Sequence, residues 1–172
     1  MDLTPSPEAN AILDQVRKMF EQDILPRNRE MIRSTKQDGE LDPPFLDELR
    51  AKAKSMGLWN MAHTDLTDRQ PGLSMSNLDY SIVAELLGRA FWSSKVFNCQ
   101  WPDVPNMVAL QRYATEEQKE QWLKPLLDGD CQSAFAMTEP GAASSDAKNI
   151  AATITPDGDD YIVDGRKWYI TG

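Results

Sequence analysis

The sequence predicts an α+β fold, in which an all-α N-terminal part is followed by a short region of β-strands. Helical periodicity and helix-capping residues recur up to about residue 130, and short apolar or β-branched runs separated by turns follow. The chain has 172 residues, of which 41% are hydrophobic and 26% charged, proportions typical of a protein with its own core. We therefore expect two domains, at residues 1–130 and 131–172.

The first two helices are marked by prolines and by a glycine. Residues 7 to about 33 form an amphipathic pattern with Ser6 as the N-cap, and Pro26 is expected to kink or divide this helix. A second pattern begins at Asp42, carries two prolines in its first turn and stops at Gly57. These signals predict a pair of helices before the first polar loop.

The next helices are predicted by capping residues. Ser76 followed by Asp79 gives a start resembling a capping box, and a broad apolar stripe follows it. A shorter helix is expected over residues 102–113. Thr115 then begins another helix, which ends before Gly129.

After residue 131 the pattern is that of strands. Two turns, at Pro156-Asp157-Gly158 and Asp164-Gly165, should join neighbouring strands. The expected strands cover residues 132–137, 149–154, 161–163 and 168–171. An aromatic strand this close to the last residue would leave an exposed edge, so we expect the chain to be a fragment of a longer protein.

Composition excludes several classes of function. The net charge is −9 and the basic residues are dispersed, which argues against nucleic acid as a partner. No apolar run is long enough to span a membrane and no signal peptide is visible, so a cytoplasmic protein is expected. The single histidine, His63, excludes a catalytic triad or a histidine metal site and is expected in a loop or at the surface. Cys99 and Cys131 are too isolated to form a zinc cage or a redox pair.

The aromatic side chains are expected to serve packing more often than ligand binding. Trp59, Trp92 and Trp122 fall on apolar helical faces or junctions and should lie in the core. The charged residues 116–120 should form a solvated helix face.

The densest chemical signal is the segment of residues 135–146, where a strand runs into a Pro-Gly turn and a series of small and hydroxyl residues. Small side chains let backbone N–H groups approach a ligand closely. Thr138, Ser144 and Ser145 supply hydroxyl groups that suit a phosphate or a heteroaromatic ring. On these residues alone a structural turn between two strands is the slightly stronger interpretation.

This segment resembles the flavin-binding signature of the acyl-CoA dehydrogenase family, with Thr138-Glu139-Pro140, small residues and then Ser145-Asp146. Residues 96–107, 115–129 and 164–171 resemble the same family in the same order, and most closely its branch of family members 10 and 11. The resemblance implies a helical N-terminal domain, here residues 1–130, and a barrel-like middle β domain that is cut short. It also implies that the family's C-terminal helical domain is absent from this chain.

The resemblance implies a set of FAD contacts in two segments. The ring contacts would come from the first segment and from Tyr169, which stands where the family usually has a tryptophan on the flavin face. Ser145 would serve both the FAD pyrophosphate and the acyl-CoA substrate, with Ser144 beside it. The implied cofactor contacts are Phe135, Met137, Thr138, Ser144, Ser145, Tyr169 and Thr171.

The function implied by the resemblance is the α,β-dehydrogenation of an acyl-CoA to a trans-2-enoyl-CoA, within fatty-acid oxidation. The family's catalytic base is a glutamate of the C-terminal domain, so no catalytic residue is assigned here and the chain alone is expected to be inactive. Glu139 is expected to cap backbone N–H groups of its own turn. Trp101 would either shorten the acyl cavity or pack in the core.

The resemblance leaves other possibilities open. The full-length protein would be a homo-oligomer, and peroxisomes or mitochondria are alternative compartments. The chain could instead be an inactive helical module for interaction or oligomerisation. The same scaffold could also carry another flavin reaction, such as monooxygenation or nitroalkane oxidation.

Overall fold

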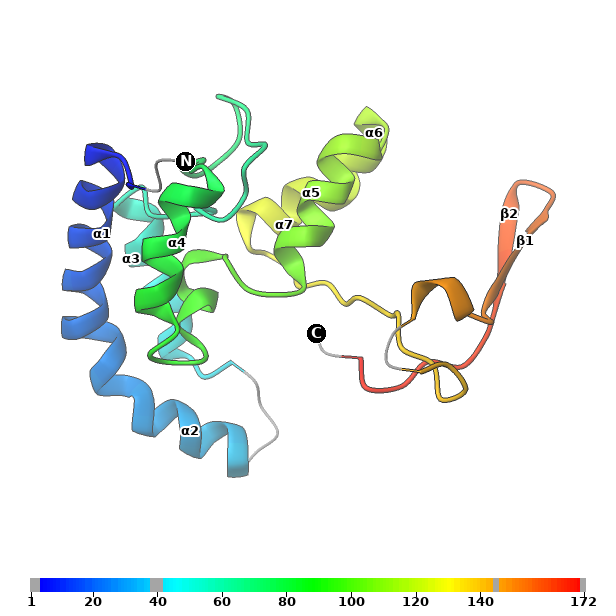
Figure 1. The fold of residues 1–172 in the computed structure, drawn as a ribbon, viewed down its shortest axis with the longest axis horizontal. Helices are drawn as coiled ribbons and strands as arrows, with labels where there is room; N and C mark the ends of the chain where they lie inside the picture. Colours follow the sequence, from blue (N-terminus) through cyan, green and yellow to red (C-terminus); the bar gives the residue numbers. More distant parts are fainter. Residues whose placement is uncertain (1–3, 38–41, 144–145, 171–172) are drawn as a thin grey trace. The chain divides into compact units, whose positions relative to one another are not determined.

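The structure, a computed structural model, describes residues 4–37, 42–143 and 146–170, without the side chains of residues 35–37 (Figure 1). The chain divides into two compact units, a helical unit of residues 1–131 and a second unit of residues 132–172. Within the described ranges, no helix combines the length and apolar character needed to cross a membrane.

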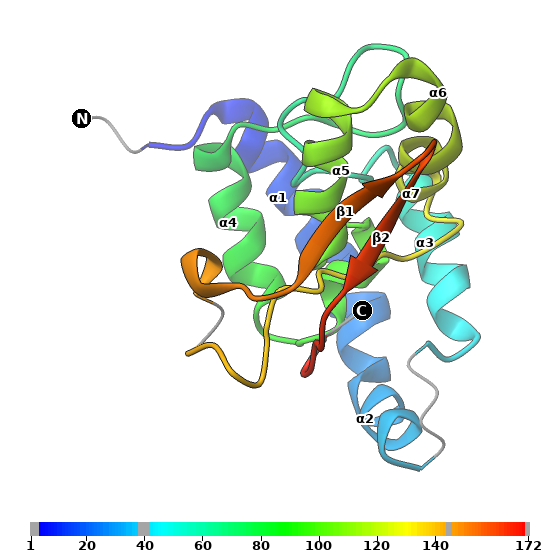
Figure 2. The same cartoon turned by 90° about the vertical axis from the view of Figure 1, so that its right-hand side faces the viewer.

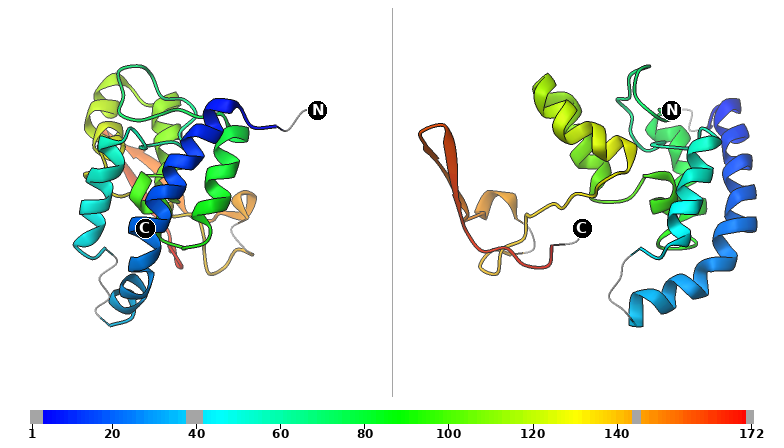
Figure 3. Two further views of the ribbon diagram at one scale, coloured as in Figure 1. Left: turned by 90° about the vertical axis from the view of Figure 1, so that its left-hand side faces the viewer. Right: turned by 180° about the vertical axis from the view of Figure 1, so that it is seen from behind.

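The first helical stretch is interrupted near its middle. Ser6 caps it as predicted, because its hydroxyl accepts a hydrogen bond from the Ala9 N–H (3.0 Å). Pro26 lies within a tight 3-10 turn, where the helix axis changes direction (Figure 3). The successive segments are α1 (Pro7–Met19), a π-helical turn (Phe20–Ile24), the 3-10 turn (Leu25–Arg27) and α2 (Asn28–Gln37).

Several of the remaining helix ends lie at residues that the sequence marked, although α3 begins at Phe45 and not at Asp42. The Ser76 hydroxyl accepts from the Asp79 N–H, Thr115 and Gln118 form a reciprocal capping box, and Gly129 ends the last helix at a φ of +74°. The segments are α3 (Phe45–Ser55), α4 (Asn77–Leu87), a 3-10 turn (Ser93–Phe97), α5 (Asp103–Tyr113), α6 (Glu116–Gln118), a π-helical turn (Lys119–Leu123) and α7 (Lys124–Asp128).

The core of the helical unit lies between α1, α3, α4 and the 3-10 turn after α4, with α1 alongside α4 (Figures 1 and 3). Trp59 and Trp92 are buried in this core, as predicted. Trp122 is 55% exposed, so its predicted burial is wrong. It lies in the second π-helical turn next to Leu123, which takes the inward position against α5 and α7.

Two other side chains differ in part from expectation. His63 lies in a loop, as one of its two expected positions, but it is fully buried and not at the surface, and its Nδ1 accepts the N–H of Asp65 (3.2 Å). Burial lowers the pKa of the His63 imidazole, which favours its neutral form. Trp101 is 63% exposed, so the expectation that it packs in the core is wrong, whereas its effect on the acyl cavity stays a prediction.

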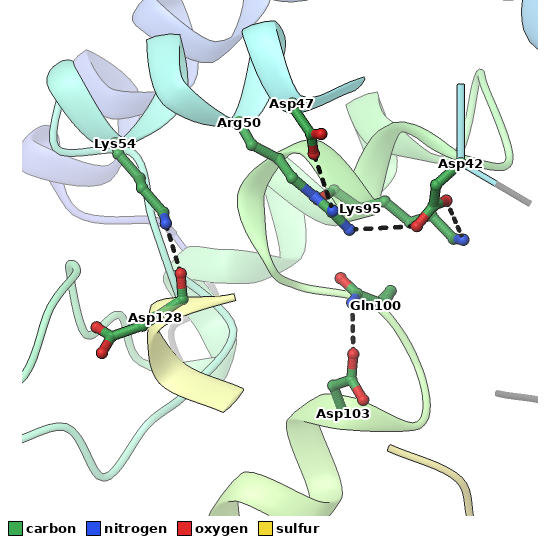
Figure 4. A network of polar contacts seen from close by, with 8 residues as sticks. All are labelled: Asp42, Asp47, Arg50, Lys54, Lys95, Gln100, Asp103 and Asp128. Atoms are coloured by element: carbon green, nitrogen blue, oxygen red, sulfur yellow. Dashed lines mark hydrogen bonds and ion pairs between the residues drawn. The ribbon is translucent and has the colours of Figure 1, made fainter. Parts of the chain in front are cut away.

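Ion pairs and a helix-end contact connect the elements of the helical unit (Figure 4). Asp42, just before α3, pairs with Lys95 (2.7 Å) and with Arg50 (3.7 Å). The ammonium group of Lys54 donates to the carbonyl oxygen of Asp128 at the end of α7. A cation at this position also complements the negative end of the helix dipole.

A buried pair of asparagines joins three parts of the helical unit. The Asn98 amide donates to Asn60 Oδ1 (2.7 Å) and to the Leu126 carbonyl oxygen (2.8 Å). The Asn60 amide donates to the carbonyl oxygens of Leu127 (3.0 Å) and Pro71 (2.8 Å). Both asparagines have left-handed backbone angles, with φ of +53° at Asn98 and +56° at Asn60.

The second unit contains one antiparallel hairpin, β1 (Thr153–Asp157) and β2 (Asp160–Asp164), visible in Figure 2. Its two-residue turn lies where the Pro-Asp-Gly sequence predicted one. Every strand residue is exposed. The register places four apolar side chains on one face and mostly Thr and Asp on the other, and the apolar residues are Ile154, Pro156, Tyr161 and Val163.

Other expected strands do not form. Residues 132–137 and 168–170 are irregular, and Asp164-Gly165 joins no second strand pair in the described part of this unit. Among the described residues, the strand pairing that defines a sheet occurs only within the hairpin. A single 3-10 turn (Ala147–Asn149) precedes β1.

Candidate functional site

The two segments that the sequence assigns to the ligand meet in the second unit. The Trp168 N–H donates to the Thr138 carbonyl oxygen (3.2 Å). The Lys167 ammonium group donates to the carbonyl oxygen of Met137 (2.9 Å). Residues some 30 positions apart are therefore joined by two direct hydrogen bonds.

Glu139 is the centre of this arrangement. Its carboxylate accepts the N–H groups of Ala151 (2.7 Å) and Ala152 (2.9 Å), as predicted for a turn carboxylate, and it pairs with Lys167 at 2.9 Å. The side chain is almost fully buried, with 5% of the residue exposed. The Lys167 contact and then the two backbone N–H groups lower the pKa of Glu139 to about 2. Glu139 is therefore ionised at neutral pH.

Sequence reasoning missed the role of Lys167. It lies in the quoted segment of residues 164–171, but nothing in the local pattern linked it to Glu139, 28 positions earlier. The usable signal was the turn carboxylate itself, because a carboxylate held against backbone N–H groups also favours a cationic partner.

The two joined segments carry aromatic side chains. Phe135 and Tyr169 are exposed, Tyr169 to 84%, and the rings of Trp168 and Tyr169 pack edge to face with centroids 5.0 Å apart. Tyr169 has a left-handed φ of +51°. A bulky residue in this conformation costs free energy, and such positions often occur at ligand sites.

The sequence-assigned residues are therefore only partly placed by the structure. Phe135, Met137, Thr138 and Tyr169 lie in the two joined segments, with Met137 and Thr138 half-buried. Ser144, Ser145 and Thr171 lie outside the described residues.

A cavity of about 310 Å³ borders Glu139 on the side of the Pro-Gly turn. Its wall is mostly backbone and small side chains, with one cation from Arg166. The lining residues are Glu139, Pro140, Gly141, Asn149, Ala151, Ala152, Gly165 and Arg166.

The aromatic rings and the backbone groups of the two joined segments suit an organic cofactor. Exposed aromatic rings beside half-buried polar backbone fit a flavin, whose ring is apolar on its faces and polar along one edge. Among residues 4–37, 42–143 and 146–170, no cluster of three or more His, Cys, Asp or Glu side chains is arranged to hold a metal ion.

Comparison with known proteins defines the class. The pattern of the acyl-CoA dehydrogenase N-terminal domain matches residues 6–130, and the chain belongs to this family. It is 40% identical to acyl-CoA dehydrogenase family member 11 of Gallus gallus over 172 residues, which cover 97% of this chain and 21% of that protein. Family member 10 of Mus musculus is also 40% identical, over 97% of this chain and 16% of its own length. The predicted family and branch are confirmed, and the chain spans about a fifth of these relatives.

Solved structures confirm the fold class. A Mycobacterium abscessus protein, provisionally described as an acyl-CoA dehydrogenase, is 42% identical with a TM-score of 0.84 over 98% of this chain and 43% of its own. An acyl-CoA dehydrogenase from Bacillus anthracis, solved in complex with FAD, has a TM-score of 0.67 over 96% of this chain and 26% of its own. At 22% identity, this second likeness shows the fold alone.

Proposed function

We propose that this chain provides the helical N-terminal domain and the flavin-facing start of the middle domain of an FAD-dependent acyl-CoA dehydrogenase. The reaction would convert an acyl-CoA to its trans-2-enoyl-CoA. The observation that carries the proposal is the Trp168–Thr138 hydrogen bond, which joins the two segments that resemble the family's flavin contacts. The family membership of the chain supports the reaction class.

The FAD contacts in this proposal are the residues of the two segments. Phe135 and Tyr169 offer exposed rings for the flavin, and Met137 and Thr138 lie beside them. Held by these residues, a flavin would supply the hydride-acceptor chemistry that removal of a hydride from the substrate β-carbon requires. The chain's own residues bind and orient the cofactor, and their aromatic rings exclude water from its face. Ser144, Ser145 and Thr171 complete the proposed set, with Ser145 also serving the acyl-CoA.

The base that removes the α-proton is assigned to a part of the protein outside this sequence. Glu139 is unsuitable, because Ala151, Ala152 and Lys167 occupy its carboxylate oxygens and its pKa is about 2. A general base works best when its pKa is near the working pH. Glu139 is therefore assigned to structure and not to proton transfer.

The test is a flavin absorbance spectrum of the protein expressed from its complete reading frame, recorded after FAD is added and the excess removed. We expect retained oxidised flavin that bleaches when acyl-CoA is added without oxygen. Acyl-CoAs of increasing chain length would then define the substrate, and sedimentation would test the proposed homo-oligomer.

Each contrary result selects an alternative. A folded but colourless protein would refute the proposal and favour a helical interaction module. A bound flavin that no acyl-CoA reduces, but that a nitroalkane or NADPH reduces, would favour another flavin reaction on this scaffold.

A further inference from the structure

We propose that Glu139 and Lys167 form a positioning pair, which holds the two flavin-facing segments in the arrangement that binds FAD. This inference rests on the proposed function and assigns a role to two residues that were not among the expected cofactor contacts. Neither side chain needs to touch the flavin for this role.

The pair connects three separate places in the chain. Lys167 donates to the Met137 carbonyl oxygen (2.9 Å) and to Glu139 Oε1 (2.9 Å). The Glu139 carboxylate in turn accepts the N–H groups of Ala151 and Ala152. One ion pair therefore links the Thr-Glu-Pro segment, the entry to β1 and the segment that carries Trp168.

Burial makes the pair energetically dependent on both members. Glu139 is buried and the Lys167 side chain is only 24% exposed, so each charge has lost most of its contact with water. A buried charge that loses its partner is strongly unfavourable, whereas a satisfied pair fixes its geometry. Removing either member should therefore loosen the contacts that both make.

The ligand-facing residues are immediate neighbours of the fixed atoms. Thr138 lies between Met137 and Glu139, and Trp168 and Tyr169 follow Lys167 directly. The described residues of this region have no strand ladder to hold them, because only β1 and β2 pair. Together with the Trp168–Thr138 backbone hydrogen bond, the ion pair supplies the rigidity that a sheet would give elsewhere, and rigid placement of contact residues governs affinity.

A close backbone approach supports the same arrangement. A Cβ atom at Gly165 would lie 2.5 Å from the Ala152 Cβ, so the chain passes directly against the segment whose N–H groups Glu139 accepts. Lys167 is two residues further along and donates to Glu139 Oε1 (2.9 Å).

The experiment compares FAD affinity among four variants of the protein expressed from its complete reading frame. Lys167→Met and Glu139→Gln each break the ion pair, and Lys167→Arg keeps the positive charge. Lys148→Met is the matched control, since it removes an exposed lysine from the same unit. FAD binding is measured by quenching of flavin fluorescence, and hydrogen exchange at the Ala151 and Ala152 amides is measured in the flavin-free protein.

We expect Lys167→Met and Glu139→Gln to weaken FAD binding about tenfold or more, as for the loss of one charge-assisted hydrogen bond. Exchange at both amides should rise in these variants while the far-UV circular dichroism of the helices stays unchanged. The FAD affinity of Lys167→Arg should lie within about threefold of that of the unsubstituted protein. The FAD affinity of Lys148→Met should equal that of the unsubstituted protein.

The contrary outcomes are distinct. If the unsubstituted protein takes up no FAD, the proposed function fails and this inference fails with it. If the unsubstituted protein binds FAD and the two pair-breaking variants bind it equally well, only the positioning role is refuted. Equal weakening by Lys148→Met, or weakening without faster exchange at Ala151 and Ala152, also refutes it.

Discussion

Replacing Asn98 by alanine should strongly destabilise the helical unit. The substitution removes two hydrogen bonds, to Asn60 Oδ1 and to the Leu126 carbonyl oxygen, both of which are buried contacts. Asn60 Oδ1 is then left without a donor, which costs about 1–3 kcal/mol, while the Leu126 carbonyl oxygen keeps the Gly129 N–H (3.1 Å) and loses one hydrogen bond worth about 1 kcal/mol. Alanine must also adopt the φ of +53°, which costs about 1 kcal/mol more than for asparagine or glycine. We therefore expect the free energy of unfolding to fall by about 3–5 kcal/mol, a large share of the total of about 5–15 kcal/mol that is typical of native proteins.

Two further substitutions separate the contributions. Asn98→Gly loses the same hydrogen bonds without the backbone cost, so it should be about 1 kcal/mol more stable than Asn98→Ala. Asn10→Ala makes the same chemical change at an exposed helix position and should alter stability by less than about 0.5 kcal/mol.

The assay is urea unfolding followed by tryptophan fluorescence, with linear extrapolation to water. Trp59 is a suitable probe, because its indole N–H donates to the Leu127 carbonyl oxygen, which also accepts from Asn60. An Asn98→Ala protein within 1 kcal/mol of the unsubstituted protein would refute the role given to this network. A glycine variant less stable than the alanine variant would refute the argument from backbone conformation.

Three other predictions concern the second unit and the tryptophans. Glu139 has a lowered pKa, so its contribution to stability is present above the unfolded pKa of about 4.5 and is lost as the pH falls toward 2. In acid titrations, the difference in stability between the unsubstituted protein and Glu139→Gln should therefore close over this range. A constant difference would contradict this prediction. Gly165→Ala should raise amide exchange around the entry to β1, because its new methyl group has no room. Gly141→Ala should leave this exchange unchanged, because a Cβ there meets no atom within 4 Å. Equal exchange in the two variants would be the contrary result. Trp92→Ala should cost about 3–5 kcal/mol in urea unfolding and the exposed Trp122→Ala less than about 1 kcal/mol, and similar losses would show that their burial is misassigned.

Features determined by neighbouring residues were predictable from the sequence. Ser76, Thr115 and Gly129 act on backbone groups within one helical turn, so their positions alone define helix ends. The hairpin turn at Gly158 is local in the same sense. The family motifs identified the class, because several ordered segments matched together.

Features that depend on distant partners were not predictable in the same way. Trp122 and Leu123 are adjacent apolar residues, and only the packing of α5 against the following π-helical turn decides which one faces inward. Residues 132–137 have strand-forming composition but belong to no strand in the described part of the chain. The Lys167–Glu139 contact spans 28 positions, and periodicity carries no information about such a pairing.

The hairpin also has a consequence for how the protein behaves in concentrated solution. Ile154, Tyr161 and Val163 are all more than half exposed on one face, and no further strand among the described residues pairs with the outer edge of β1 or of β2. Surfaces of this kind promote edge-to-edge pairing and aggregation between molecules. Preparations limited to this region should therefore become turbid as concentration rises. Replacing Val163 by lysine, which would put a charge on the apolar face, is the direct way to keep such samples clear.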